Sequence, residues 1–232
     1  MDYPLSAYHK GKTLRVGQSV FCEKGVKLDI RGKGVSLRGI LHYGGLTPID
    51  GDIMGPFRFL PMECRHGITS MRHNLIGTVT LNGEKLDFTG GVGYIESDSG
   101  YSFPDRYTWI HCNQLGGDCS IMASVARIPL CGLRFWGCIC VVWLNGREYR
   151  LATYKVVRVI RCGPGGMVLE QGGLRLEITV QPQNGHMLAA PRLGVMSRTI
   201  RENASCPAAF RFTKGGRVLF EGKSRYASFE YV

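Results

Sequence analysis

The sequence has no long apolar run. Segments such as Cys138–Leu144 fall far short of the roughly 20 residues that a membrane-spanning helix needs, so no transmembrane span is expected. The first residues, Met-Asp-Tyr-Pro-Leu-Ser, also lack the basic start and apolar core of a secretory signal. The expected location is therefore the cytoplasm, with peripheral contact at the inner face of a membrane left open.

The cysteines, 9 in number, lack the paired CxxC spacing of zinc ribbons and thioredoxin-like sites. Cys138 and Cys140 instead alternate with Ile139 and Val141 inside an apolar run, where small thiols pack like hydrophobic side chains. We therefore expect reduced, structural thiols and no metal site.

Concentrated basic segments are absent as well, although the net charge is +11. Residues 1–75 carry 11 Lys and Arg against 6 Asp and Glu, and the remainder carries 18 against 12. The basic residues stand singly between apolar ones, as on the solvent-facing side of strands. Specific nucleic-acid binding needs exposed aromatic residues among clustered basic ones, so it is the least favoured of the functions considered.

Helical periodicity is scarce, whereas glycine is abundant, with 32 residues placed between short alternating segments. This spacing is typical of many short strands joined by tight turns. Three hairpins are predicted, with their turns at Asn82-Gly83, Asn145-Gly146 and Gly172-Gly173. Because no amphipathic helices separate the strands, the sequence predicts an all-β protein built as barrels or a sandwich.

A proline-containing segment interrupts this pattern. Met54–Cys64 holds two prolines and a glycine, so we expect a loop that crosses between sheets. We place the domain boundary shortly after it. This gives an N-terminal β domain over residues 1–75 and a C-terminal β domain over residues 76–232.

The segment Tyr94–Asn113 is dense in acidic, aromatic and turn-forming residues. Side chains alternate along an extended strand, so Tyr94, Glu96 and Asp98 are expected on one face, with neighbouring carboxyl groups about 6 to 7 Å apart. The strand that returns after the turn likewise has a shared face, formed by Tyr107, Trp109, His111 and Asn113. This mixture of groups predicts an interior pocket for a mostly apolar small molecule.

Two carboxyl groups side by side in a pocket suit acid catalysis. Mutual repulsion and burial favour the neutral form of one of them, so Glu96 or Asp98 would keep a proton available near neutral pH and act as general acid. The alternative is structural, because acids beside a turn often cap its backbone or pair with a neighbour such as Arg106.

A second candidate pair lies in Met62–Gly67, where Glu63 and His66 are three residues apart. The pair fits an acid/base or metal-binding role, but two ligands without a third at a recognisable spacing are a weak metal signal. Structural hydrogen bonding by His66 is the favoured interpretation.

Several unusual motifs follow one another along the chain. They are Gly44-Gly-Leu-Thr-Pro48, Ile53-Met-Gly-Pro-Phe57, Pro61-Met-Glu-Cys-Arg-His-Gly67, Phe88-Thr-Gly-Gly-Val-Gly-Tyr-Ile-Glu96, Ser102-Phe-Pro104 and Leu219-Phe-Glu-Gly222. In this order they resemble the tocopherol cyclase family, especially its bacterial members. The resemblance covers nearly the whole chain.

The resemblance implies two lipocalin-like, calycin-type β-barrels or half-barrels, related to the hydroxyneurosporene synthase group, with the first incomplete at its N-terminus. An incomplete barrel exposes a sheet edge, so a homodimer paired through that edge is a further expectation. The resemblance also implies a reaction without a cofactor, in which a prenylated quinol closes to a chromanol. In that reaction an alkene is protonated and the phenol oxygen captures the cation.

By position in these motifs, the resemblance assigns the proton donor to Glu96 and its partner to Asp98. Glu96 ranks first because the plant motif has an amide at the position of Asp98. Tyr94 and Trp109 would face the cation, and His111 and Asn113 would orient the substrate. The expected substrate-binding set comprises Tyr94, Tyr107, Trp109, His111, Asn113, Glu63 and His66.

Two departures from the family pattern keep a second function open. Ser99 and Leu115 stand where the family usually has large aromatic residues, and fewer rings would stabilise a cation less well. The alternative is therefore a lipocalin-like protein that binds a hydrophobic small molecule without catalysis. In both cases the expected partner is a prenylated quinol, another isoprenoid or a lipid.

Overall fold

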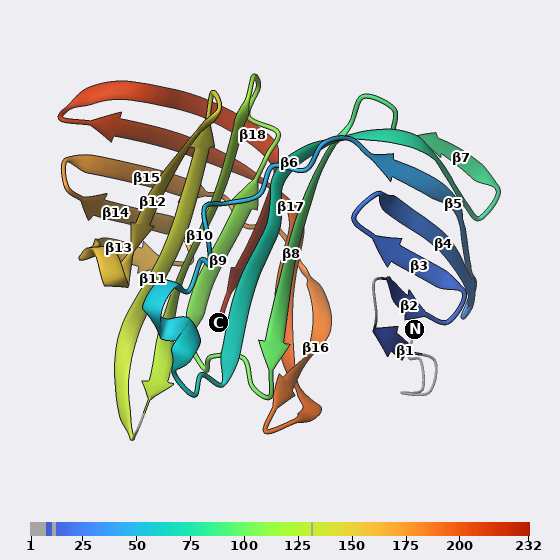
Figure 1. Ribbon diagram of the computed structural model, residues 1–232, viewed down its shortest axis with the longest axis horizontal. Coiled ribbons are helices and arrows are strands. Elements are labelled where there is room, and N and C mark those ends of the chain that lie inside the picture. The colour runs from blue at the N-terminus through green and yellow to red at the C-terminus, as the bar shows by residue number, and fades with distance from the viewer. Residues whose placement is uncertain (1–7, 11–12, 131) are drawn as a thin grey trace. The chain divides into compact units, whose positions relative to one another are not determined.

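The structure is a computed structural model of the 232-residue chain, and it describes residues 8–10, 13–130 and 132–232. These residues form strands almost throughout, apart from loops and two short 3-10 helices, η2 (Gly55–Phe59) and η3 (Thr153–Lys155) (Figure 1). Among the described residues, none of the helices has the length and apolar character needed to span a membrane. The predicted all-β class is confirmed.

Eight strands form the first antiparallel sheet, in the order β1-β2-β3-β4-β5-β6-β7, with β8 also paired to β6. Their bounds are β1 (Tyr8–Lys10), β2 (Leu14–Val16), β3 (Ser19–Cys22), β4 (Gly25–Gly32), β5 (Val35–Tyr43), β6 (Cys64–Leu81), β7 (Glu84–Asp87) and β8 (Val92–Gly100). A small core of Val26, Leu41 and Val79 is buried on this sheet.

Ten strands form the second antiparallel sheet, in the order β12-β11-β10-β9-β18-β17-β15-β14-β13, with β16 paired to β17. Their bounds are β9 (Tyr107–Cys112), β10 (Cys119–Leu130), β11 (Leu133–Leu144), β12 (Arg147–Ala152), β13 (Arg158–Gly163), β14 (Gly166–Gln171), β15 (Leu174–Val180), β16 (His186–Arg192), β17 (Val195–Lys214) and β18 (Arg217–Tyr231).

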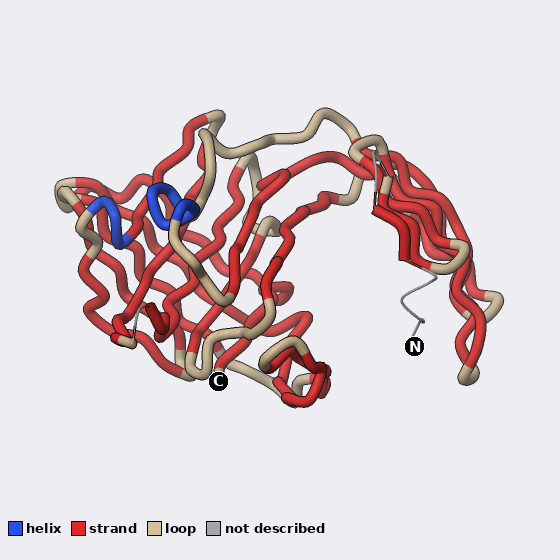
Figure 2. Tube along the Cα trace, turned by 60° about the horizontal axis from the view of Figure 1, so that its bottom comes forward, coloured by secondary structure: helices blue, strands red, loops and turns tan. Residues whose placement is uncertain are grey.

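The second sheet curls around an apolar core (Figure 2). Its largest buried side chains are Phe210, Phe212 and Phe229, each no more than 1% exposed. Near the two ends of the sheet, the side-chain amide of Gln171 joins β14 to β12: it accepts from the backbone N–H of Ala152 and donates to a β12 carbonyl, both at 2.9 Å. The curled sheet therefore packs its interior with apolar side chains.

All three predicted hairpin turns are present. Asn82-Gly83 joins β6 to β7, Asn145-Gly146 joins β11 to β12, and Gly172-Gly173 joins β14 to β15. Both residues of each turn have a positive φ, between 49° and 93°. Two-residue hairpins of type I′ require this conformation, which glycine and asparagine adopt most easily.

The chain divides into two compact units. One comprises the described residues up to Thr47 together with Arg72–Tyr94, and the other comprises Pro48–Met71 and Ile95–Val232. The predicted domain boundary between residues 75 and 76 falls inside β6, a strand whose residues belong to both units. The assignment of domains to residues 1–75 and 76–232 stays a prediction.

The loop Met54–Cys64, which we expected to cross between sheets, follows β5 of the first unit and belongs to the unit that contains the second sheet. This segment belongs to the connection between β5 and β6, which are neighbours in the first sheet. Its prolines break the hydrogen-bond ladder, as expected, but the chain then returns to the sheet that it left. The segment contains η2, which begins with a proline in its first turn.

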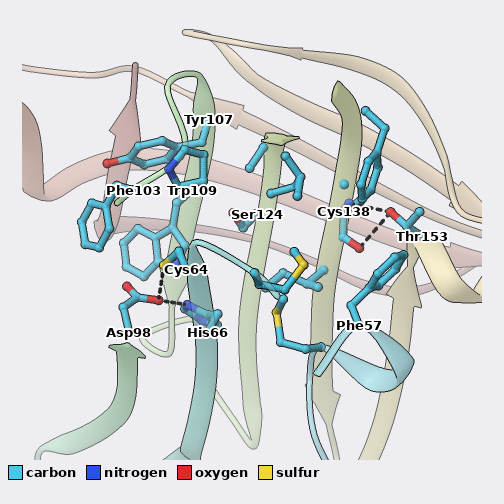
Figure 3. Close-up of a pocket in the computed structure, with 18 of the residues that line it drawn as sticks. Phe57, Cys64, His66, Asp98, Phe103, Tyr107, Trp109, Ser124, Cys138 and Thr153 are labelled. Carbon is cyan, nitrogen blue, oxygen red and sulfur yellow. Dashed lines mark hydrogen bonds and ion pairs between the residues drawn. The ribbon is translucent and has the colours of Figure 1, made fainter. Parts of the chain in front are cut away.

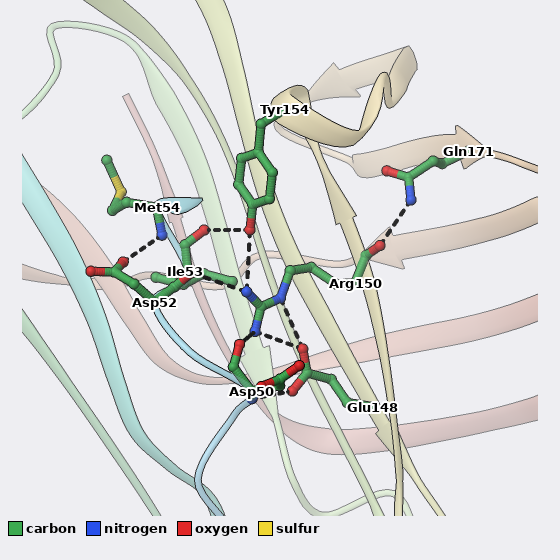
Figure 4. Close-up of polar contacts among 8 residues, drawn as sticks. All are labelled: Asp50, Asp52, Ile53, Met54, Glu148, Arg150, Tyr154 and Gln171. Carbon is green, nitrogen blue, oxygen red and sulfur yellow. Dashed lines mark hydrogen bonds and ion pairs between the residues drawn. The ribbon is translucent and has the colours of Figure 1, made fainter. Parts of the chain in front are cut away.

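Arg150 on β12 holds the start of this connection (Figure 4). Its guanidinium donates to the backbone carbonyls of Asp50, at 2.6 Å, and Asp52, at 3.0 Å, and pairs with Glu148 at 2.7 Å. The hydroxyl of Tyr154 adds a bond of 2.9 Å to the next carbonyl along the chain. A planar fork of donors thus fixes the loop backbone against β12.

Candidate functional site

A cavity of about 180 Å³ lies on one face of the second sheet. Two cross-strand rows of lining residues form its floor, Glu230–Trp109–Ser124–Ile139 and Tyr107–Ala126–Gly137. The smallest residues of the two rows are Ser124 and Ala126 on β10 and Gly137 on β11, beside the much larger Trp109 and Tyr107 on β9. This pattern of sizes leaves a hollow above β10.

The cavity lies on the face of the sheet opposite the packed core. Along β9, Ile110 and Cys112 point into the core, whereas Tyr107 and Trp109 line the cavity. Alternation along a strand separates the two sets. The interior pocket that the sequence led us to expect therefore lies on the other side of these strands, because apolar side chains fill the inside of the curled sheet.

The apolar end of the cavity is formed by Met54, Phe57, Ile128, Phe135 and Ile139. The Phe57 ring, on η2, stacks on the Phe135 ring of β11 with centroids 5.7 Å apart. The loop that Arg150 holds thus supplies part of this wall. Figure 3 shows Phe57 across the cavity from Asp98.

The polar end of the cavity is formed by His66, Glu96, Asp98, Tyr107 and Glu230. The imidazole of His66 lies between two carboxyl groups, with Nδ1 2.8 Å from Asp98 Oδ1 and Nε2 3.2 Å from Glu96 Oε2 (Figure 3). Burial disfavours the charged ring, but the hydrogen bonds to Asp98 and Glu96 outweigh it and raise the pKa of His66 to about 9. His66 therefore carries a positive charge at neutral pH.

Cys64 adds a thiol beside this cluster, with its Sγ 3.8 Å from Asp98 Oδ1. Burial and the neighbouring Asp98 raise the pKa of Cys64 to about 12. The thiol therefore stays protonated, which makes it a weak hydrogen-bond donor to Asp98 and a poor nucleophile.

Glu230 and Tyr107 form the second ionisable pair of the polar end. The Tyr107 hydroxyl donates a hydrogen bond of 2.6 Å to Glu230 Oε2. Burial raises the pKa of Glu230, and the charges of Glu202, Glu96 and Asp98 raise it further, while the bond from Tyr107 opposes them. Burial and the Glu230 charge also raise the pKa of Tyr107.

The structure brings together residues that the sequence placed in two separate clusters. Glu96 and Asp98 of β8 contact His66 of β6, and Tyr107 and Trp109 of β9 line the same cavity. The predicted pairing of an acid with Arg106 is replaced by pairing with His66. Hydrogen bonding by His66 was the favoured interpretation of the sequence, but its partners lie more than 30 residues along the chain rather than at Glu63.

Four predicted site residues lie elsewhere. Tyr94 belongs to the first unit. The backbone carbonyl of Glu63 accepts a hydrogen bond of 2.9 Å from the amide of Tyr101, just after β8, and neither the Tyr94 nor the Glu63 side chain lines the cavity. His111 is buried 6.4 Å from the Trp109 ring, and burial lowers its pKa to about 3. Asn113 is buried beyond the end of β9. Their assigned roles stay predictions.

Glu230 was not among the predicted site residues. It alternates with Phe229 and Tyr231 near the end of β18, a pattern that is equally typical of a solvent-facing acid. The register with β9 places it directly opposite Trp109, more than 100 residues earlier in the chain. Only this long-range pairing identifies it as a cavity residue.

Within the described part of the chain, no group of three or more His, Cys, Asp or Glu side chains is arranged to hold a metal ion. The indole Nε1 of Trp109 is buried and has no hydrogen-bond partner among the described residues.

Comparison with solved structures shows a similar fold in a known protein. The chain is similar in fold to the crystal structure of kievitone hydratase from Nectria haematococca, with a TM-score of 0.54 at 14% sequence identity. The match covers 90% of this chain but 65% of that one, so this chain spans less than two thirds of its length. No protein-family model and no curated protein matches, and the resemblance to tocopherol cyclases stays a prediction. The lipocalin-like β-barrel fold of the hydratase agrees with the predicted fold class, which is thereby confirmed.

Proposed function

We propose that this chain is a tocopherol-cyclase-like protein, which binds a mostly apolar molecule bearing an alkene and adds a hydroxyl oxygen to that alkene without a cofactor. The leading case is closure of a prenylated quinol to a chromanol. Addition of water to a double bond, the reaction that the name kievitone hydratase describes, can begin with the same step, protonation of an alkene.

The observation that carries this proposal is the division of one cavity into an apolar end and a polar end. Phe57 and Phe135 offer aromatic surface at one end, and three carboxyl groups and a charged imidazole meet at the other. Shielding an acid from water favours protonation of an alkene, and nearby aromatic faces stabilise the resulting cation. The half-buried Glu230 and the rings of Phe57 and Phe135 support this proposal.

The size of the cavity restricts which part of a substrate it holds. A volume of about 180 Å³ is close to that of engineered cavities, about 150 Å³, that bind a single aromatic ring. Drug-sized ligands usually occupy roughly 300–1,000 Å³. We therefore assign the cavity to the ring and the first alkene of the substrate, with a longer isoprenoid tail extending beyond it.

Conversion of a prenylated hydroquinone tests this function. The purified chain is incubated with the quinol, and the cyclised isomer is separated and quantified by chromatography with mass detection. We expect product with the wild type and at least a 100-fold lower rate with Glu96→Gln, because general acid–base catalysis contributes about 10² to 10⁴ in rate. Glu221→Gln, an exposed acid on β18, is the matched control and should convert the quinol at the wild-type rate.

A second function, binding without catalysis, has an observation of its own in its favour. Glu96 and Asp98 are both engaged by His66, with side chains 25% and 35% exposed, rather than enclosed in apolar surroundings. Stoichiometric capture of an unchanged lipid from a cell extract, with no isomer formed from any prenylated quinol, would select this function over the cyclase.

A further inference from the structure

Glu230 is a half-buried carboxyl group at the polar end of the cavity. It stands on β18 in a cross-strand row between Glu202 on β17 and Trp109 on β9. The Tyr107 hydroxyl lies 2.6 Å from its Oε2. Its neighbours on the cavity side are therefore the indole ring of Trp109 and the phenol ring of Tyr107.

Glu230 has no cationic partner among the ion pairs of the described residues. The guanidinium of Arg198, on β17, is directed to the backbone carbonyls of Phe103 and Pro104, and His66 is held by Glu96 and Asp98. The titratable groups facing Glu230 are thus three acids and a phenol. Such surroundings favour a neutral carboxylic acid.

Glu96 and Asp98 are in the opposite situation. Each has an oxygen within 3.2 Å of a nitrogen of the charged His66 ring. This places them to receive a proton rather than to give one. When carboxyl groups in one site have such different neighbours, one commonly acts as the proton donor and another as the proton acceptor.

We propose that Glu230 is a further catalytic residue, the acid that protonates the alkene, and that Glu96 receives the proton of the attacking phenol. This inference rests on the proposed function. The alkene π electrons form a new C–H bond with the Glu230 proton, and Glu230 becomes a carboxylate. The phenol oxygen then forms a C–O bond to the cationic carbon as its O–H proton passes to Glu96. Return of that proton to Glu230 through solvent restores both groups, so the reaction is a net isomerisation.

Substitution of the two acids separates their roles in heavy water. Glu230→Gln should bind the prenylated hydroquinone with an unchanged dissociation constant, and should neither form product nor introduce deuterium into recovered substrate. Glu96→Gln should also form little product, but reversible protonation by Glu230 should label the substrate with deuterium. Glu221→Gln, on the same strand but exposed, controls for the loss of a negative charge.

The dependence of activity on pH distinguishes a catalytic role of Glu230 from a purely structural one. Activity should fall as pH rises through the pKa of Glu230, because only the neutral acid donates. Glu202→Gln removes a like charge, which lowers the pKa of Glu230, so the fall in activity should occur at lower pH. Tyr107→Phe removes a hydrogen bond that stabilises the carboxylate, so the fall should occur at higher pH. An infrared band of a neutral carboxyl group, present in the wild type and absent from Glu230→Gln, would locate the proton directly.

The outcomes distinguish the two proposals. Wild-type conversion with loss of both product and labelling in Glu230→Gln supports the role of Glu230. Wild-type conversion with an active Glu230→Gln variant overturns that role and leaves the proposed function standing. Absence of conversion by the wild type overturns the proposed function, and the catalytic role of Glu230 with it.

Discussion

Strands β9 and β10 pack one face against the apolar core and line the cavity with the other. One face carries Ile110 and Ile121, both fully buried in the core of the curled sheet. The other carries Trp109 and Ser124, which line a cavity with acids at one end. Close packing on the core face holds the strands in fixed positions. The cavity above the small residues of the other face therefore stays open instead of closing by movement of the strands.

The largest effect is expected on the core face. Phe212→Ala removes a fully buried ring, and substitutions of this kind cost about 3–5 kcal/mol of unfolding free energy. Urea unfolding measures the loss. Ser124→Ala on the cavity face should cost well under about 1 kcal/mol, and equal losses at the two sites would show that the faces do not differ as described.

The charge of His66 makes the stability of the cavity face depend on pH. Its pKa is raised from 6.5 to about 9 in the folded chain, so the stabilisation is fully present below pH 6.5 and is lost as pH rises through about 9. The contribution is up to about 3 kcal/mol for a shift of this size. Unfolding free energies between pH 6 and pH 10 should decline for the wild type, and a parallel decline in His66→Gln would contradict the assignment.

The loop beside the cavity depends on Arg150, whose side chain is 10% exposed. Arg150→Met removes charge-assisted bonds to two carbonyls and should cost about 2–3 kcal/mol while weakening ligand binding through the displaced Phe57. Arg175, 41% exposed and paired with Glu170 and Glu177, is the matched control. Arg175→Met should cost no more than about 1 kcal/mol, as is usual for surface pairs.

The smallest effect on stability is expected when two alanines of β10 are replaced by leucine. Ala123 points into the core and Ala126 lines the cavity. Ala123→Leu overpacks the core and should cost about 1–3 kcal/mol, whereas Ala126→Leu fills open space and should change stability by less than about 0.5 kcal/mol. Only Ala126→Leu should abolish binding of a prenylated hydroquinone, measured by quenching of Trp109 fluorescence. Loss of binding in the Ala123 variant alone would place the ligand inside the curled sheet.

Local features of the fold could be predicted from the sequence. The turns at Asn82-Gly83 and Asn145-Gly146 follow from backbone preferences of adjacent residues, and alternation correctly put Glu96 and Asp98 on one face. These inferences depend only on neighbours in the chain. The all-β class follows from the same local patterns.

Features that depend on distant pairings could not be predicted. Apart from Arg127, both faces of β10 consist of small or apolar residues, so the sequence does not distinguish the core face from the cavity face. Glu230 reaches the site only through pairing of β18 with β9, and Arg150 holds a loop nearly 100 residues earlier in the chain. The prolines of Met54–Cys64 mark a break in the sheet but carry no information about where the loop packs.

The central claim is that the cavity protonates an alkene of a bound molecule. The most direct measurement is incubation of the wild-type chain with a prenylated hydroquinone in heavy water, followed by mass spectrometry of everything recovered. The account predicts a cyclised isomer that carries one carbon-bound deuterium next to the new C–O bond. Recovery of bound quinol that is neither labelled nor cyclised would contradict protonation of the alkene and would favour binding without catalysis.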